Sequence, residues 1–196
     1  MDSNIINRID LPKLIDKDSP VGVELGVCTG KFSLNIIETY NFKQFFMIDI
    51  WPERRTGPRA KKWKAKKERW LASGKSKEQY ITTHINHYIS LIKYSKECTK
   101  TDVIPLRGYF KEFVQWFEDE YFDFIYIDGL AHTGQESGET IRDWLPKIKS
   151  TGIICGHDYN NIVTRVYVDL IAKENNFKVN VTGLDDTYPS WYYTSV

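Results

Sequence analysis

The stretch VGVELGVCTGK, residues 21–31, decides which fold the sequence predicts. Its apolar run, residues 21–25, stops at a glycine and is followed by a segment in which Phe32, Ile36 and Ile37 can share one helical face. Strand, glycine turn and helix in this order are typical of the first βα unit of a nucleotide-binding α/β sheet.

The turn contains Gly26 and Gly30, and Glu24 lies inside the end of the strand. Glycine allows backbone angles that strain other residues, and it lets main-chain N–H groups approach a ligand closely. A dinucleotide-binding G-x-G-x-x-G fingerprint would need a third glycine, so a nicotinamide dehydrogenase is a weaker hypothesis. The other interpretation is an ordinary turn between a strand and a helix.

Composition predicts one domain, residues 1–196, with its own hydrophobic core, because 41% of the residues are hydrophobic and 27% are charged. No apolar run approaches the ~20 residues that span a bilayer, and the polar N-terminus does not resemble a signal peptide. Cys28, Cys98 and Cys155 form no C-x-x-C pair. Reduced thiols in a cytoplasmic protein are the simplest interpretation.

Basic residues are concentrated in one segment, which we treat as an insertion at about residues 52–78. Residues 54–77 contain eleven Lys or Arg and one acid, Glu68, whereas the rest of the chain has 16 basic and 25 acidic residues. One interpretation is a solvated helix anchored by Trp63 and Trp70, seven residues apart. The other is a surface for an anionic partner, such as nucleic acid, a phosphorylated sugar or an acidic glycan. No nucleic-acid-binding motif supports the first of these partners.

An acid ends the second predicted strand, residues 44–51. Asp49 lies 19 residues beyond Gly30, an interval that suits a carboxylate accepting both hydroxyls of a ribose. The alternative is a helix cap or a loop acid.

Two histidines, His84 and His87, lie three residues apart in a helical pattern over residues 80–98. Because no acidic or cysteine partner is near them in sequence, a partly exposed helix pair is favoured over a metal site.

The carboxyl-terminal half carries most of the candidate chemistry. YFDFIYIDG (121–129) predicts a strand, ESGETIRDWLPKIK (136–149) a helix, and IICGHDY (153–159) a further strand, so the three make a right-handed βαβ crossover. Ligand sites in such sheets lie beyond the carboxyl ends of the strands. The polar residues expected at that edge are Glu24, Asp49, Asp128, His132, His157 and Asp158.

Together these motifs resemble the class I methyltransferases of family 24, which use S-adenosylmethionine (SAM) and whose relatives include O-methyltransferases of sugars and natural products. The resemblance runs from about residue 21 to the C-terminus. It rests on DFIYIDG, the nearby histidine, DWLPKIK and TGIICGHDY. Two features depart from the family: IDGLAHTGQ stands where I-D-G-x-H-x-Y is common, and the basic segment is long.

The resemblance implies a Rossmann-like α/β fold, with a seven-stranded, mostly parallel sheet, an antiparallel last strand and helices on both faces. It also implies roles for individual residues. Glu24, Gly26 and Gly30 would line the methionine and ribose side of SAM, Asp49 would bind the ribose hydroxyls, Gly108 and Tyr109 would flank the adenine, and Asp128 would lie beneath the sulfonium.

Methyl transfer is an in-line displacement, so the protein mainly positions donor and acceptor. A hydroxyl acceptor must also lose a proton, to a base or under the influence of a metal. His132 and His157 are the candidate bases, and Asp128 with Asp158 could instead hold Mg²⁺. The alternatives are a buried His157 bonded to backbone and an Asp158 that caps the following helix.

The leading hypothesis is therefore a SAM-dependent methyltransferase that methylates a hydroxyl of a sugar or other small molecule. The second is a methyltransferase-fold protein that binds nucleic acid or another polyanion through its basic helix without catalysis. Acids at the ends of several predicted strands favour the enzyme.

Overall fold

The computed structural model describes residues 7–51, 68, 72–74, 76–130, 133–183 and 188–195. Most of the basic insertion and the candidate base His132 lie outside these residues.

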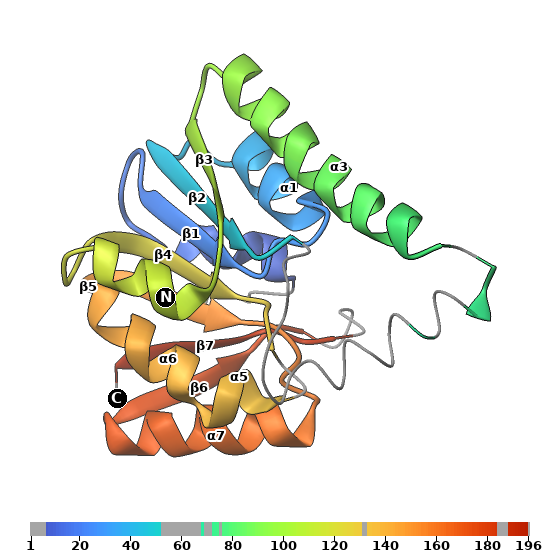
Figure 1. Cartoon of the computed structure of the whole chain (residues 1–196). Helices are drawn as coiled ribbons and strands as arrows, with labels where there is room; N and C mark the ends of the chain where they lie inside the picture. Colours follow the sequence, from blue (N-terminus) through green and yellow to red (C-terminus); the bar gives the residue numbers. More distant parts are fainter. Residues whose placement is uncertain are drawn as a thin grey trace.

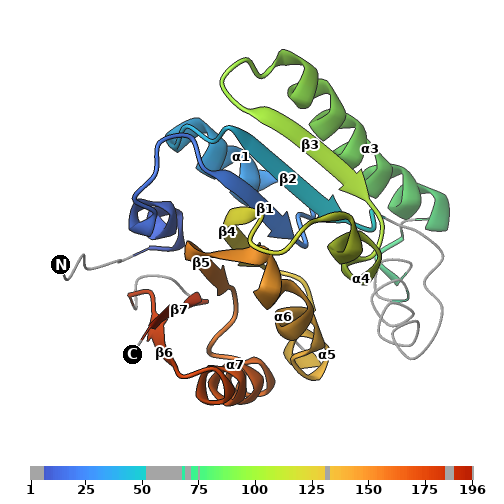
Figure 2. The ribbon, with the colours of Figure 1, turned by 90° about the vertical axis from the view of Figure 1, so that its left-hand side faces the viewer.

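Seven strands form one mixed sheet in the order β3-β2-β1-β4-β5-β7-β6. Their bounds are β1 Val21–Leu25, β2 Gln44–Asp49, β3 Asp102–Arg107, β4 Phe122–Ile127, β5 Ile148–Gly156, β6 Phe177–Val181 and β7 Trp191–Ser195. Neighbours among β1 to β5 are parallel, as the arrowheads of β1, β2 and β3 show in Figure 2. Strand β7 is antiparallel to both β5 and β6. The predicted Rossmann-like sheet with an antiparallel last strand is confirmed.

Helices cover both faces of the sheet (Figure 1). One face carries η1 (Arg8–Leu14), α1 (Lys31–Thr39) and α3 (Lys77–Glu97). The other carries α4 (Phe110–Phe113), η2 (Val114–Trp116), α6 (Glu139–Trp144) and α7 (Ile162–Glu174), together with α5 (Gly134–Ser137) and η4 (Leu145–Lys147). Among the helices that the structure describes, none combines the length and apolar character needed to cross a membrane.

Strand β1 shows how the sequence divides the core into two layers. Because successive side chains of a strand point to opposite faces, Val23 and Leu25 pack in the layer that contains α6 and α7. Gly22 faces the other layer, where a Cβ atom would lie 2.7 Å from a ring carbon of Phe42 and 2.8 Å from one of Phe45. Glycine at this position therefore lets two aromatic rings lie against the strand.

The predicted helix over residues 136–149 is wrong at its C-terminal end. Pro146 lies in the closing turn η4, and β5 begins at Ile148. The early start is possible because the pairing of β4 and β5 shifts register between Phe122 and Phe124, so β5 takes up extra residues as a bulge. The helix is also divided, since Gly138 is left-handed with φ 82° between α5 and α6.

A buried carboxylate joins three segments at the amino end of β4. Asp123 accepts hydrogen bonds from the Val21 N–H at 2.8 Å and from the Nζ atoms of Lys17 and Lys149 at 2.9 Å each. Burial alone would raise the pKa of this carboxyl, but the Val21 N–H and the two ammonium groups outweigh it and lower the pKa from 3.8.

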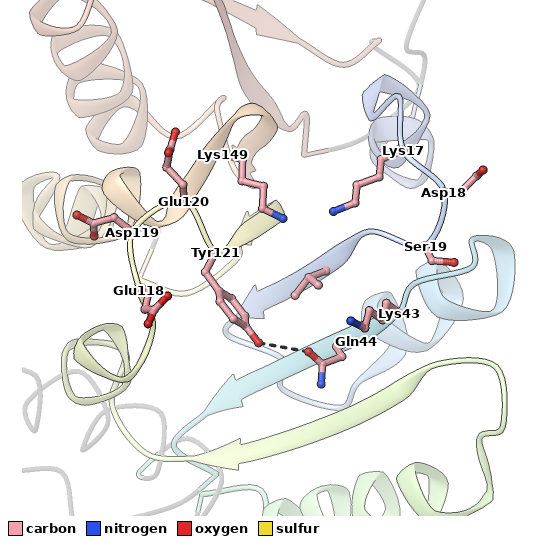
Figure 3. A pocket seen from close by; sticks show the side chains of 11 residues that line it. Lys17, Asp18, Ser19, Lys43, Gln44, Glu118, Asp119, Glu120, Tyr121 and Lys149 are labelled. Carbon is pink, nitrogen blue, oxygen red and sulfur yellow. Dashed lines mark hydrogen bonds between the residues drawn. The ribbon is translucent and has the colours of Figure 1, made fainter.

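The same region borders a pocket of about 510 Å³ (Figure 3). The Lys17 and Lys149 side chains point toward one another in this view, and the Tyr121 hydroxyl donates to Gln44 Oε1 at 3.3 Å. The pocket lies where β1, β2 and β5 begin, so it is at the edge opposite to the predicted ligand site. Its central polar groups bind one another and stabilise the fold.

We predict that Asp123→Asn lowers the free energy of unfolding by about 1–3 kcal/mol at pH 7, because it removes the buried charge that the Val21 N–H and two ammonium groups contact. A lowered folded-state pKa means that this stabilisation is complete above the unfolded pKa and is lost as pH falls through the folded one. In urea unfolding, the difference in free energy of unfolding between Asp123→Asn and wild type should therefore shrink below about pH 3.8. The control is Asp119→Asn, which alters an exposed ion pair with Lys147. Equal stability of Asp123→Asn and wild type at pH 7 would contradict the assignment.

Candidate active site

The glycine loop after β1 requires glycine at both predicted positions. Gly26 has φ 101°, and a Cβ atom there would lie 2.5 Å from the backbone nitrogen of Gly129, just after β4. Gly30 has φ 85° and directly precedes α1, and a Cβ atom there would lie 2.4 Å from Leu91 Cδ2 on α3. Both the backbone angle and the available space exclude a larger residue without rearrangement.

Asp49, at the end of β2, holds this loop against its own strand. Its Oδ2 atom accepts the Cys28 N–H at 2.7 Å, and its Oδ1 atom accepts the Ile50 N–H at 2.6 Å. The Trp51 N–H also donates to Oδ1, at 3.4 Å. A carboxylate has about four acceptor positions, so these three bonds leave acceptor capacity on the same carboxylate for a ligand. The Nε1–H of Trp51 donates to the Cys28 carbonyl at 2.7 Å and holds the loop from its other side.

Gly108 and Tyr109 follow β3, next to Asp49. The Gly108 N–H donates to the Asp49 carbonyl at 3.0 Å, and a Cβ atom on Gly108 would lie 2.7 Å from the Phe113 ring. Tyr109 is half-buried and directly precedes α4. The structure thus brings this predicted pair to the same edge as the glycine loop.

Glu24 lies in β1 and is 1% exposed. It accepts a hydrogen bond from the Ser33 hydroxyl on α1. Burial raises the pKa of its carboxyl to about 8, and the negative charge of Asp128 adds to the rise, whereas Ser33 and Arg8 oppose it. Glu24 is therefore mostly protonated at neutral pH in the absence of a ligand.

Three further side chains meet where β4 and β5 end. His157 Nδ1 lies 3.2 Å from Asp128 Oδ1 and 3.2 Å from Asp158 Oδ1. The ligand atoms of the three residues all lie within 4.8 Å of one another. Helix α7 is capped by Asn161, whose side chain accepts the N–H groups of its first turn, so Asp158 is not the helix cap that the sequence offered as an alternative.

The protonation of one ring atom decides what this cluster can do. If Nδ1 carries a proton, it donates to the two carboxylates, and Nε2 is the atom with a lone pair that can accept a proton. If Nδ1 is unprotonated, it can serve with the two carboxylates as a metal ligand. The ring atom cannot do both at once.

One residue that sequence reasoning missed reaches this edge from the N-terminal segment. Arg8 Nη1 lies 3.7 Å from Asp128 Oδ2, and its guanidinium carbon lies 4.8 Å from the centre of the Phe32 ring. No sequence pattern marks Arg8, because its position follows from how η1 packs on α1. Tyr188 is also close, with its ring centre 6.0 Å from that of His157.

The structure thus brings the described candidates to one edge of the sheet. The exception among the predicted site residues is His132, which lies outside the described residues. The histidine pair His84 and His87 lies on α3, with ring centres 5.9 Å apart.

We predict that Glu24→Gln flattens the pH dependence of stability. Because the folded-state pKa is about 8 and the ordinary value is 4.5, the folded protein holds the extra proton between these values, and its stability falls as pH rises through them. The slope from one proton is at most about 1.4 kcal/mol per pH unit. Urea unfolding from pH 5 to 9 gives the slope of the free energy of unfolding against pH. This slope should be shallower for Glu24→Gln than for wild type, and it should be unchanged for Glu38→Gln, which alters an exposed residue. An unchanged slope in Glu24→Gln would contradict the raised pKa.

Comparison with known proteins supports the same family that the motifs resemble. A family model described as a methyltransferase domain, methyltransferase family 24, matches residues 23–159. A search of curated proteins found no match.

Solved structures share the fold. Precorrin-6Y C5,15-methyltransferase from Geobacter metallireducens has a TM-score of 0.59 and 14% identity, over 100% of this chain and 92% of that chain. A putative SAM-dependent methyltransferase from Methanococcus maripaludis has a TM-score of 0.59 and 10% identity, over 95% and 81%. An SAH-bound methyltransferase from Podospora anserina has a TM-score of 0.56 and 13% identity, over 90% and 72%.

Identities this low show the fold alone, but the family model covers more than half of the chain. The chain therefore belongs to methyltransferase family 24 and is a class I methyltransferase, an enzyme that uses SAM.

Proposed function

We propose that the enzyme methylates a hydroxyl group of a sugar or another small molecule, with His157 as the general base. The observation that carries this proposal is the His157 Nδ1 atom, which lies 3.2 Å from each of two carboxylates. This arrangement orients the ring and favours the tautomer whose Nε2 atom accepts a proton. A hydroxyl acceptor requires a base to remove its proton, whereas a more acidic acceptor would not require one.

In this proposal SAM lies across the strand ends in the order of the sheet. Gly108 and Tyr109 after β3 flank the adenine, and Asp49 at the end of β2 accepts the ribose hydroxyls. The Glu24 to Gly30 segment lines the methionine. Asp128 at the end of β4 lies by the sulfonium. The strand order β3-β2-β1-β4 supports this placement. It spreads these residues along one edge of the sheet in the order in which they would contact the adenine, the ribose and the methionine part of SAM.

The reaction then needs positioning and one proton transfer. The acceptor oxygen attacks the methyl carbon in line with the sulfur and forms the new carbon–oxygen bond. The carbon–sulfur bond breaks, and its electron pair goes to the sulfur, which becomes the neutral thioether of S-adenosylhomocysteine (SAH). The hydroxyl proton passes to His157 Nε2. The imidazolium that forms is stabilised by Asp128 and Asp158, which contact its other nitrogen.

A metal-assisted reaction is the second candidate, favoured by the fit of the same cluster to a divalent ion. Two carboxylates and one imidazole within 4.8 Å supply donor atoms of the right kind. Asp128 and Asp158 would hold Mg²⁺, with His157 as a third ligand. Such an ion would acidify the acceptor hydroxyl.

The basic segment supports an acceptor with negative charge, such as a phosphorylated sugar or an acidic glycan. Its eleven basic residues and single acid contrast with the acidic remainder of the chain, and such a concentration of positive charge attracts an anionic substrate. Membership in a methyltransferase family favours this role over polyanion binding without catalysis.

We predict that Asp49→Ala weakens SAM binding by more than about tenfold, since two hydrogen bonds from the ribose to a carboxylate are lost. Asp49→Asn should lose less, because its amide oxygen still accepts. Calorimetric titration with SAM and with SAH gives the affinities, and Asp102→Ala, exposed at the start of β3, is the control. Full affinity in a folded Asp49→Ala protein would reject this placement of the cofactor.

Chelator treatment should distinguish the reaction with a histidine base from the metal-assisted reaction. Turnover is followed as SAH formation with the best acceptor from a panel of sugars, sugar phosphates and phenols. With His157 as base, EDTA leaves the rate unchanged, and His157→Ala lowers it by ~10²- to 10⁴-fold. With a metal, EDTA abolishes turnover, Mg²⁺ restores it, and Asp158→Asn loses both the ion and the rate.

Full activity of His157→Ala would reject His157 as the base. If His132→Ala were then inactive, the base would be His132, the other histidine that the sequence predicts near this edge.

A further inference from the structure

We propose that Arg8 binds the α-carboxylate of the methionine part of SAM and selects SAM over analogues that lack this group. The inference rests on the proposed placement of the cofactor. It assigns a ligand contact to the N-terminal segment, in which the sequence marks no functional residue.

The packing of η1 fixes where Arg8 can reach. Residues three apart on a 3₁₀ helix lie on the same side, so Arg8 and Leu11 share one face of η1. Leu11 is fully buried in the core layer that contains Phe32 and Ile36 of α1. Arg8 is thereby held over the first turn of α1, where its guanidinium lies on the Phe32 ring.

The direction of the ligand brings its carboxylate to the same place. With the ribose on Asp49 at β2, the methionine extends across β1 toward β4, because these strands are neighbours in that order. Asp128 follows the end of β4, and Arg8 Nη1 lies 3.7 Å from its Oδ2 atom. Arg8 also lines a pocket of about 290 Å³ with Lys31, Phe32 and Asn35.

The charges at this edge explain why an arginine is needed. The methionine part of SAM carries two positive groups, the sulfonium and the ammonium, and one carboxylate. The carboxylates of Asp49 and Asp128 suit the positive groups and repel the carboxylate. Arg8 places a guanidinium among them, and its planar fork of N–H donors matches a carboxylate bidentately.

The contact between Arg8 and Asp128 is compatible with this role. Its 3.7 Å separation exceeds the 2.7–2.9 Å that is typical of a charge-assisted N–H···O bond. A ligand carboxylate at hydrogen-bonding distance would therefore interact with the guanidinium more strongly than Asp128 does.

The test compares SAM with decarboxylated SAM, which lacks only the carboxylate. Wild-type protein should bind SAM at least about tenfold more tightly. Arg8→Ala should weaken SAM binding by a similar factor and leave the affinity for decarboxylated SAM unchanged or higher, since a positive charge facing a cationic ligand is removed. Arg8→Lys should recover part of the preference. Lys13→Ala, at the other end of η1, is the matched control.

Each outcome of the calorimetry is informative. The carboxylate contact is supported if Arg8→Ala loses the preference for SAM over decarboxylated SAM and the control Lys13→Ala keeps it. An equal loss of affinity for both ligands means that Arg8 only stabilises the site, and it overturns the inference. Wild-type protein that binds SAM without preferring it also overturns the inference but leaves the proposed function standing. Wild-type protein that binds neither ligand rejects the cofactor placement and the inference with it.

Discussion

The close contact between the loops after β1 and β4 is the constraint on which the site depends. The N–H groups of Asp128 and Gly129 both donate to the Leu25 carbonyl, at 2.9 and 2.8 Å, and Gly26 leaves no space for a Cβ atom against Gly129. The Gly26 N–H in turn donates to the Ile48 carbonyl of β2 at 2.8 Å. Backbone contacts thus fix the spacing between the glycine loop, Asp49 and Asp128, and the bonds of the Asp49 and Trp51 side chains to Cys28 add to them.

This backbone frame holds several carboxylates close together, and burial, together with their mutual repulsion, favours protonation of one of them. Glu24 is buried beside Asp128 and Asp49, and its raised pKa keeps it mostly neutral at pH 7. Arg8 Nη1 forms an ion pair with Asp128 at 3.7 Å, and His157 Nδ1 lies 3.2 Å from the Oδ1 atom of the same carboxylate. A ligand with positive groups would replace these compensations, so binding of such a ligand would favour ionised Glu24 and couple to release of its proton.

Sequence reasoning predicted the edge of the site well, because it depends on topology. Once residues 21–25, 44–49 and 122–127 are assigned as parallel strands, Glu24, Asp49 and Asp128 must approach one another. Arg8 and Trp51 could not be found in this way, since their contacts with Phe32 and Cys28 follow from tertiary packing. The early start of β5 at Ile148 depends on a register shift against β4, which neither apolar periodicity nor turn residues encode.

The choice between a base and a metal is a choice between two states of one nitrogen. His157 Nδ1 faces both Asp128 and Asp158, so it either donates a proton to them or joins them as a ligand. In the second state the proton moves to Nε2, and the ring can no longer accept one from a substrate. The two mechanisms therefore exclude each other at this site. Two carboxylates alone would suit Mg²⁺, so the presence of a histidine between them favours the state in which Nδ1 holds the proton.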